Sequence, residues 1–168
     1  YEDDVYFSFL PLAHIMERLI ITLLITHGRP FGFYTGSPAR IIEDAGYLKP
    51  TLMCGVPRIF QRVYEAIQKK LSKLPYFKKL LVEKAVEQKA KDFKERGILK
   101  NCFWDPIVFN EFKNVLGGKV RFMLTGSAPM DPEILCFLKI AFCCPIVEGY
   151  GQTEDCAGML LSNIFDNV

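Results

Sequence analysis

One glycine-rich heptapeptide in the last quarter of the chain has side chains that could hold a magnesium–nucleotide complex. Its sequence is Glu148-Gly149-Tyr150-Gly151-Gln152-Thr153-Glu154. The glycines let the backbone approach a ligand closely. Tyr150 offers a flat ring for a base, Thr153 a hydroxyl for a phosphate oxygen, and Glu154 a carboxylate for Mg²⁺, which takes one or two carboxylates together with phosphate oxygens and water. On composition alone, a glycine-rich turn with incidental polar residues is the alternative.

Other signatures of nucleotide sites and hydrolases do not fit the chain. The heptapeptide fails the dinucleotide fingerprint G-x-G-x-x-G, because Glu154 stands where the third glycine should be. The sequence has no P-loop of the form G-x-x-x-x-G-K-[ST] and no G-x-S-x-G nucleophile elbow. Ser127 is therefore a poor candidate for a hydrolase nucleophile.

Short apolar runs alternate with helical patterns along the chain. The predicted strands are Val5–Leu10, Phe31–Tyr34, Thr51–Val56, Lys119–Thr125 and Ile146–Val147. Helices are expected over His14–Thr26, from the N-cap Ser37 to about Asp44 with Gly46 as the stop, over Pro57 to about Leu71, within 75–100 up to Gly97, over Val108–Leu116 up to Gly117, and over Pro132–Phe142 after the N-cap Asp131.

This alternation predicts an α/β fold whose mostly parallel sheet has helices on both faces. Ligands of such sheets bind at the carboxyl ends of the strands. Two loops that follow predicted strands are therefore candidates for the site, namely Thr125–Pro129 and Glu148–Glu154.

Composition and charge exclude several classes of protein. Half of the 168 residues are apolar and 24% are charged, as in ordinary globular proteins rather than disordered ones. Residues 69–100 hold ten lysines and Arg96 against four acidic residues, so this segment is strongly basic although the whole chain carries only +2. Two interpretations stay open: peripheral contact with an anionic membrane, or a solvated helical face. No aromatic-interleaved basic motif indicates nucleic-acid binding.

The cysteines and histidines do not have the spacing of a metal cluster. None of the six cysteines forms a Cys-x-x-Cys pair, and the two histidines are His14 and His27. Thiols in apolar surroundings usually serve as small core residues, so we predict a reducing compartment. His27 precedes Gly28 at the expected end of a helix, where it could cap the last carbonyls.

Several segments resemble the adenylate-forming enzymes. The heptapeptide is similar to their Y-G-x-T-E motif, and residues 10–18, Leu-Pro-Leu-Ala-His-Ile-Met-Glu-Arg, resemble the L-P-L-A-H-x-x-E-R segment of long-chain fatty-acid-CoA ligases. Further matches follow in the family's order at Pro50-Thr51, Val56-Pro57-Arg58, Leu116–Arg121 and Thr125–Pro129. The resemblance covers essentially the whole chain.

The resemblance implies a reaction and a set of site residues. The family activates a carboxylic acid with ATP and passes the acyl group to coenzyme A. It implies that Thr153 contacts the α-phosphate, that Glu154 holds Mg²⁺, and that His14 lies near the substrate carboxylate. The adenine would lie between Tyr150 and Ser127-Ala128-Pro129, with Glu148 and Gly149 at its edge, and with Gly151 and Gln152 completing the nucleotide loop. His14 as a packed, hydrogen-bonded residue is the alternative.

The resemblance also implies a place within a larger enzyme. Residues 1–168 correspond to the central segment of the large N-terminal adenylating domain, with a Lys-rich helical insertion at about 69–112 and no C-terminal lid domain. We expect the fragment alone to be inactive. For the whole protein we expect activation of a long-chain fatty acid, in the cytoplasm or on a cytosol-facing membrane such as the endoplasmic reticulum. An adenylating enzyme for another acid, and a non-catalytic nucleotide-binding or membrane-docking module, are the alternatives.

Overall fold

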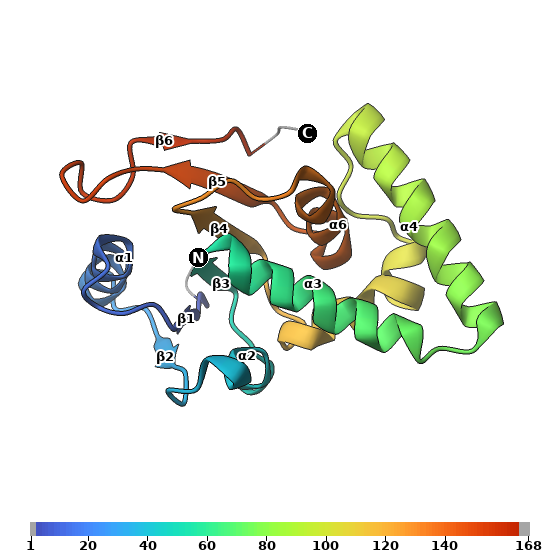
Figure 1. Ribbon diagram of the computed structural model, residues 1–168, viewed down its shortest axis with the longest axis horizontal. Helices are drawn as coiled ribbons and strands as arrows, with labels where there is room; N and C mark the ends of the chain where they lie inside the picture. Colours follow the sequence, from blue (N-terminus) through green and yellow to red (C-terminus); the bar gives the residue numbers. More distant parts are fainter. Residues whose placement is uncertain (1–2, 165–168) are drawn as a thin grey trace.

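A six-stranded sheet forms the centre of the protein. The computed structural model describes residues 3–164. The strands are β1 (Tyr6–Ser8), β2 (Phe31–Phe33), β3 (Leu52–Gly55), β4 (Phe122–Gly126), β5 (Ile146–Tyr150) and β6 (Leu160–Leu161), in the spatial order β2-β1-β3-β4-β5-β6 (Figure 1). The first five strands pair in parallel, and β6 runs antiparallel to β5. The prediction of a mostly parallel sheet is confirmed.

Helices cover both faces of this sheet, as the sequence predicted. Helix α1 (Ile15–Thr26) packs on the face that carries Tyr6 and Cys54. The opposite face is covered by α2 (Ile41–Leu48), α3 (Pro57–Ser72) and α6 (Pro132–Phe142), together with the short segments between Asp105 and Leu116. Because successive strand residues point to opposite faces, Phe7 and Met53 lie in this larger core while their neighbours Tyr6 and Cys54 face α1.

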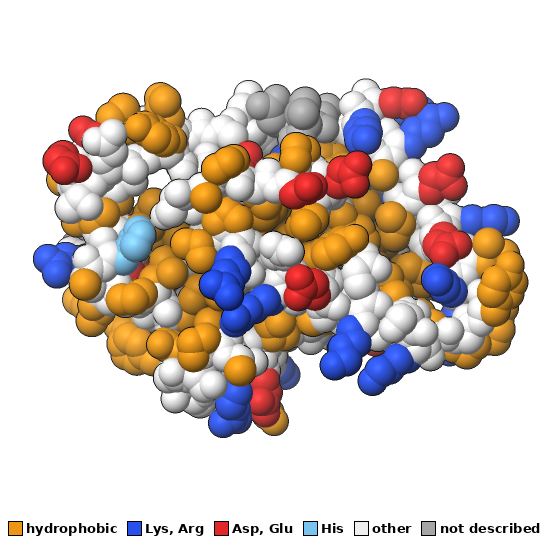
Figure 2. Space-filling model, viewed as in Figure 1, with side chains coloured by type: hydrophobic (Ala, Val, Ile, Leu, Met, Phe, Trp, Pro, Cys, Tyr) orange, Lys and Arg blue, Asp and Glu red, His pale blue; other side chains and the backbone are white. Residues whose placement is uncertain are grey.

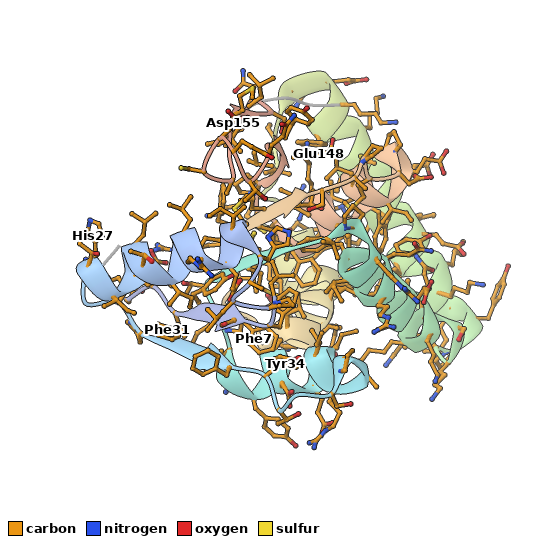
Figure 3. The ribbon with its side chains drawn as sticks, turned by 60° about the vertical axis from the view of Figure 1, so that its left-hand side comes forward. Phe7, His27, Phe31, Tyr34, Glu148 and Asp155 are labelled. Carbon is orange, nitrogen blue, oxygen red and sulfur yellow. The ribbon has the colours of Figure 1, made fainter. Side chains whose placement is uncertain are left out.

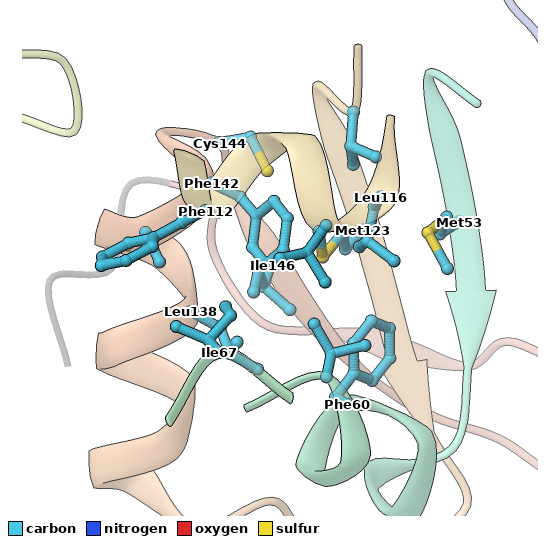
Figure 4. Packing of buried hydrophobic residues seen from close by; sticks show 14 of the residues in the cluster. Met53, Phe60, Ile67, Phe112, Leu116, Met123, Leu138, Phe142, Cys144 and Ile146 are labelled. Atoms are coloured by element: carbon cyan, nitrogen blue, oxygen red, sulfur yellow. The ribbon is translucent and has the colours of Figure 1, made fainter. Parts of the chain in front are cut away.

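The larger core is filled by apolar side chains from elements far apart in the sequence. Figure 4 shows Ile67 of α3 beside Leu138 of α6, and in the same cluster Phe60, Phe142 and the strand residues Met53, Met123 and Ile146. Phe60, Ile67, Met123 and Leu138 are fully buried. This packing fixes the strands against α3 and α6, and so fixes the loops at the strand ends.

A long helix, α4 (Tyr76–Arg96), extends from the end of α3 and packs on α6. It buries Val82, Ala85 and Phe93, and also Lys89. The Lys89 ammonium pairs with Asp105, lies 2.9 Å from Cys143 Sγ, and sits 4.0 Å from the centre of the Phe109 ring. A charged residue is therefore part of the contact between α4 and the core.

Most predicted helix ends are confirmed. Asp131 accepts hydrogen bonds from the N–H groups of Glu133 and Ile134 at 2.8 and 3.2 Å, as an N-cap should. Gly97 and Gly117 end their helices with φ of +69° and +85°, and His27 Nδ1 lies 2.7 Å from the carbonyl oxygen of Leu23. No helix within residues 3–164 has both the length and the apolar character needed to cross a lipid bilayer.

Two predicted helices differ in detail. Gly46 does not end α2, which continues to Leu48 because Lys49 takes the left-handed conformation at φ +54°. Ser37 precedes a 3₁₀ turn, η1 (Pro38–Arg40), and its side chain makes no capping hydrogen bond. The helix expected over Val108–Leu116 is a succession of a π-helical segment η2 (Asp105–Phe109), α5 (Asn110–Lys113) and a 3₁₀ turn η3 (Asn114–Leu116).

Candidate functional site

The carboxyl ends of the parallel strands meet at a small cavity. Its volume is about 160 Å³, and it brings together residues at the ends of four strands. Its lining includes His14 after β1, Gly55 and Val56 at the end of β3, Gly126 and Ser127 at the end of β4, and Gly149, Gly151, Gln152 and Thr153 from β5 and the loop beyond it. Two predicted catalytic residues, His14 and Thr153, thus line one cavity although 139 positions separate them.

A second, wider cavity of about 560 Å³ adjoins the first. Ser127, Gly149 and Gly151 line both. The wider cavity is also lined by the remaining predicted base-binding residues, which are Ala128, Pro129, Glu148 and Tyr150. The structure therefore gathers the residues predicted to bind the nucleotide around two joined hollows.

Glu148 fixes one wall of the wider cavity. Its carboxylate Oε1 accepts a hydrogen bond of 3.0 Å from the backbone N–H of Met130, which ties the Ser127–Pro129 loop to β5. The backbone N–H of Glu148 donates to Ser162 Oγ at 2.9 Å, and the Ser162 N–H donates to the Glu148 carbonyl at 2.8 Å. Glu148 thus joins the two loops and β6, with one carboxylate oxygen engaged inside the protein.

Close backbone contacts explain the glycines of the site. A Cβ at Gly151 would lie 2.0 Å from the carbonyl oxygen of Ala157, and one at Gly126 would lie 3.0 Å from that of Gly149. The loop after β5 is tightly folded, since Cys156 and Ala157 both have positive φ. Ser127 also has positive φ, at +71°, directly after β4. Such conformations cost energy and are concentrated at functional sites.

His14 is held as the N-cap of α1. Its Nδ1 accepts a hydrogen bond of 3.3 Å from the Met16 N–H, so the neutral ring carries its proton on Nε2. Cys54 lines the same cavity. Burial, and next to it the Glu17 charge, raise the pKa of the Cys54 thiol to about 12. This thiol is therefore neutral at physiological pH and unsuited to act as a nucleophile.

Glu154 lies apart from the other predicted residues. It is exposed and lines neither cavity. Figure 3 shows Glu148 on β5 and Asp155 on the loop beyond it, the loop to which Glu154 belongs. A magnesium ion would fit here only if the phosphates of the nucleotide and water supplied most of its ligands. No group of three His, Cys, Asp or Glu within residues 3–164 could enclose a metal, but Mg²⁺ needs only one or two carboxylates when phosphates and water supply the rest.

The sequence did not predict some of the cavity residues. Leu160 and Leu161 of β6 and the next residue, Ser162, line the wider cavity, and Ala157 lines the smaller one. The apolar run Met159-Leu160-Leu161 is the one signal for β6 in the sequence, and it is too short to predict a strand by itself.

Comparison with known proteins identifies the family. The family model described as "AMP-binding enzyme" matches residues 1–167. The chain belongs to the AMP-binding enzyme family. It is 43% identical over 159 residues to "Long chain acyl-CoA synthetase 5" of Arabidopsis thaliana, which covers 94% of this chain and 24% of that protein. It is 42% identical over 156 residues to "Long-chain-fatty-acid--CoA ligase 5" of Mus musculus, and this match covers 93% of this chain and 22% of that protein. The AMP-binding chain thus spans about a quarter of the length of these relatives.

Solved structures of other proteins show the same fold. The adenylation domain of a carboxylate reductase from Mycobacterium chelonae matches with a TM-score of 0.67 and 23% identity, over 93% of this chain and 21% of that one. A long-chain-fatty-acid-CoA ligase from Archaeoglobus fulgidus matches with a TM-score of 0.53 and 14% identity. This match covers 94% of this chain and 25% of that one. At these identities the likeness concerns the fold alone.

Proposed function

We propose that the protein activates a long-chain fatty acid with ATP and transfers the acyl group to coenzyme A. The supporting observation is the convergence of His14, Thr153 and the loops after β4 and β5 on two joined cavities. The names of its relatives, long chain acyl-CoA synthetases and long-chain-fatty-acid-CoA ligases, support the choice of acid.

The reaction has two balanced steps. The carboxylate oxygen of the acid attacks the α-phosphorus of ATP, the bond to the β-phosphate oxygen breaks, and acyl adenylate and pyrophosphate result. The thiol of coenzyme A then attacks the acyl carbon, AMP leaves, and the thiol proton is released. Negative charge develops on phosphate oxygens in the first step and on the acyl oxygen in the second, so donors fixed beside these atoms lower both barriers.

The residues of this chain have distinct roles in the proposal. The wider cavity takes the adenine between Tyr150 and the Ser127–Pro129 loop, because Tyr150 and all three residues of this loop line it. Thr153 donates its hydroxyl proton to an α-phosphate oxygen. His14 lines the same small cavity and donates from Nε2 to the carboxylate of the acid.

Glu154 would hold Mg²⁺ together with the phosphates of ATP. Its carboxylate is exposed at the loop that carries Thr153, where phosphates could reach it. When bound, the metal neutralises charge on the phosphate oxygens and orients them.

We further propose that the protein works inside the cell, in the cytoplasm or on a cytosol-facing membrane such as the endoplasmic reticulum. All six cysteines are free thiols, which is typical of reducing compartments. A long-chain fatty acid partitions into lipid, so contact with a membrane surface would bring the enzyme to its substrate.

The test is an assay of the full-length protein with ATP, Mg²⁺, coenzyme A and palmitate. Formation of palmitoyl-CoA with release of pyrophosphate supports the proposal, and hydroxylamine should trap the adenylate when coenzyme A is omitted. Short-chain and aromatic acids serve as comparison substrates. Equal or faster turnover of those acids would contradict the proposed acid, and ATP binding without acid-dependent pyrophosphate release would contradict the reaction itself.

A further inference from the structure

The connection between α3 and α4 turns large apolar side chains toward solvent. Tyr76 is 83% exposed and Phe77 68% exposed, and Leu80 and Leu81 on the next turn of α4 are exposed as well. Figure 2 shows hydrophobic side chains gathered at the right-hand end of the molecule, where Figure 1 shows this connection. We call residues 69–84 the α3–α4 tip. The four exposed side chains, Tyr76, Phe77, Leu80 and Leu81, belong to no core cluster of the described residues.

Lysines surround these apolar side chains. The tip contains six lysines, all exposed, and a single acidic residue, Glu83. The lysines are Lys69, Lys70, Lys73, Lys78, Lys79 and Lys84. Within residues 3–164, no carboxylate forms an ion pair with any of them. The positive charge of the tip is therefore not neutralised locally.

The tip stands at the opposite end of the molecule from the candidate site. In Figure 1, β4 and β5 point toward the left, where the nucleotide loop lies, and the α3–α4 connection forms the right-hand extremity. The sheet edges β2 and β6 are also remote from it. Helix α4 is held on the core by the buried Lys89 and Phe93, so the tip projects from a fixed support.

We infer that the α3–α4 tip is a docking surface for an anionic lipid membrane. Tyrosine and phenylalanine are suited to the boundary between headgroups and acyl chains. Exposed lysines beside them attract anionic lipids, and binding strength grows with both apolar area and charge. A second copy of the chain is a poorer occupant, because two tips would bring twelve lysines together. The inference deepens the proposed membrane location, but it does not depend on the adenylation chemistry.

The experiment is co-sedimentation of the full-length protein with vesicles. Vesicles of phosphatidylcholine containing phosphatidylserine are compared with vesicles of phosphatidylcholine alone. One variant, Lys73→Gln/Lys78→Gln/Lys79→Gln, removes charge from the tip, and another, Tyr76→Ser/Phe77→Ser, removes apolar surface. The matched control, Lys91→Gln/Lys94→Gln/Lys100→Gln, removes the same charge from exposed lysines outside the tip.

We expect the lysine variant of the tip to weaken binding to the anionic vesicles by about fivefold per lysine, roughly a hundredfold in total. The loss should be larger at low salt, where attraction is less screened. The control variant should bind nearly as well as the unmodified protein, and the Tyr76→Ser/Phe77→Ser variant should bind weakly to vesicles at any salt concentration. Phe77→Trp adds a direct probe, whose emission should shift to the blue only when anionic vesicles are present.

Three results would overturn the inference. Equal weakening by the tip and control lysine variants would show that net charge, not the tip, binds lipid. Unchanged binding of Tyr76→Ser/Phe77→Ser would show that the apolar side chains are not inserted. Blue-shifted emission of Phe77→Trp without vesicles would show that the tip is covered by protein. Palmitate-dependent pyrophosphate release, measured separately on the same proteins, tests the proposed reaction, so either proposal can fail while the other stands.

Discussion

The phenol of Tyr6 on β1 donates a 2.7 Å hydrogen bond to the fully buried carboxylate of Glu17 on α1. Ser8, two residues along the same strand, donates its hydroxyl to the other carboxylate oxygen at 2.5 Å. Glu17 follows His14 by one turn of α1. The carboxylate thus joins β1 to the helix that the candidate catalytic histidine caps.

This relationship predicts a pH dependence of stability. Burial raises the pKa of Glu17, and the hydrogen bonds from Ser8 and Tyr6 only partly oppose it. A raised pKa in the folded state means that folding favours the protonated form. The contribution of Glu17 to stability is therefore greatest below the ordinary glutamate pKa of about 4.3 and is lost as the pH rises through the raised value.

Glu17→Gln should remove this dependence, because the amide has no charge and can keep both contacts, its oxygen accepting from one hydroxyl and its NH2 donating to the other. Urea unfolding of both proteins at several pH values between about 4 and 7, which starts near the ordinary glutamate pKa, would measure how the free energy of unfolding depends on pH. The variant should gain stability relative to the unmodified protein as the pH rises. Glu17→Leu, which leaves two buried hydroxyls without partners, should lose about 1–3 kcal/mol for each of them. An identical pH profile in the Gln variant would contradict the assignment.

Gly151 is predicted to be indispensable for the geometry of the nucleotide loop. In Gly151→Ala, the new methyl group would meet the carbonyl oxygen of Ala157 at 2.0 Å, so the loop that carries Thr153 must move. Displacement of a positioning group by about 1 Å can cost about a hundredfold in rate. Acid-dependent pyrophosphate release of the full-length enzyme would measure this loss.

Gly158→Ala is the matched control, since nothing lies within 4 Å of a Cβ at that position. It should leave the rate of pyrophosphate release nearly unchanged. If both variants lost activity alike, a general sensitivity of the loop, and not the contact between Gly151 and Ala157, would be responsible.

Lys89 is predicted to stabilise the attachment of α4 through its charge pair with Asp105. Burial raises the pKa of Asp105, but the hydrogen bond from Lys89 and other contacts outweigh it and lower the pKa overall. Lys89→Met keeps the apolar stem but leaves a largely buried carboxylate unpaired, so it should destabilise the fold by about 3–5 kcal/mol. Urea unfolding would measure the change.

The double variant Lys89→Met/Asp105→Asn tests whether the charge is responsible. Without the carboxylate, most of the stability should return, because no unpaired charge remains in the core. If the double variant were as unstable as Lys89→Met alone, the lost packing of Lys89 on Phe109 and Cys143 would explain the effect instead.

The sequence predicted the place of the site better than its walls. Parallel strands end at a common edge, so the loops after β4 and β5 had to meet once the alternation of strands and helices was recognised. That argument brought Ser127 and Thr153 together, whereas His14 was placed beside them only by the resemblance, and all three line the smaller cavity.

Other features depend on tertiary contacts that leave little trace in a sequence. Strand β6 has two residues and exists through its pairing with β5. Two residues are too few to show the apolar–polar alternation that predicts a strand. Lys89 belongs to a lysine-rich segment that is typical of a solvated face, yet Asp105, 16 positions away, allows it to be buried. Gly46 looked like a helix stop, but the helix is ended instead by Lys49 at positive φ.

The last prediction concerns the metal. Glu154 is exposed and touches neither cavity, so Glu154→Gln should leave the melting temperature unchanged. If its carboxylate holds Mg²⁺ against the phosphates, the same change should reduce acid-dependent pyrophosphate release by about 10²–10³-fold, as expected for one lost electrostatic contact in the transition state. The required Mg²⁺ concentration should rise as well. Asp155→Asn removes a charge from the adjacent position, which is also exposed, and should change neither quantity. Near-normal turnover of Glu154→Gln at low Mg²⁺, or an equal loss in Asp155→Asn, would contradict the assignment of Glu154 to the metal.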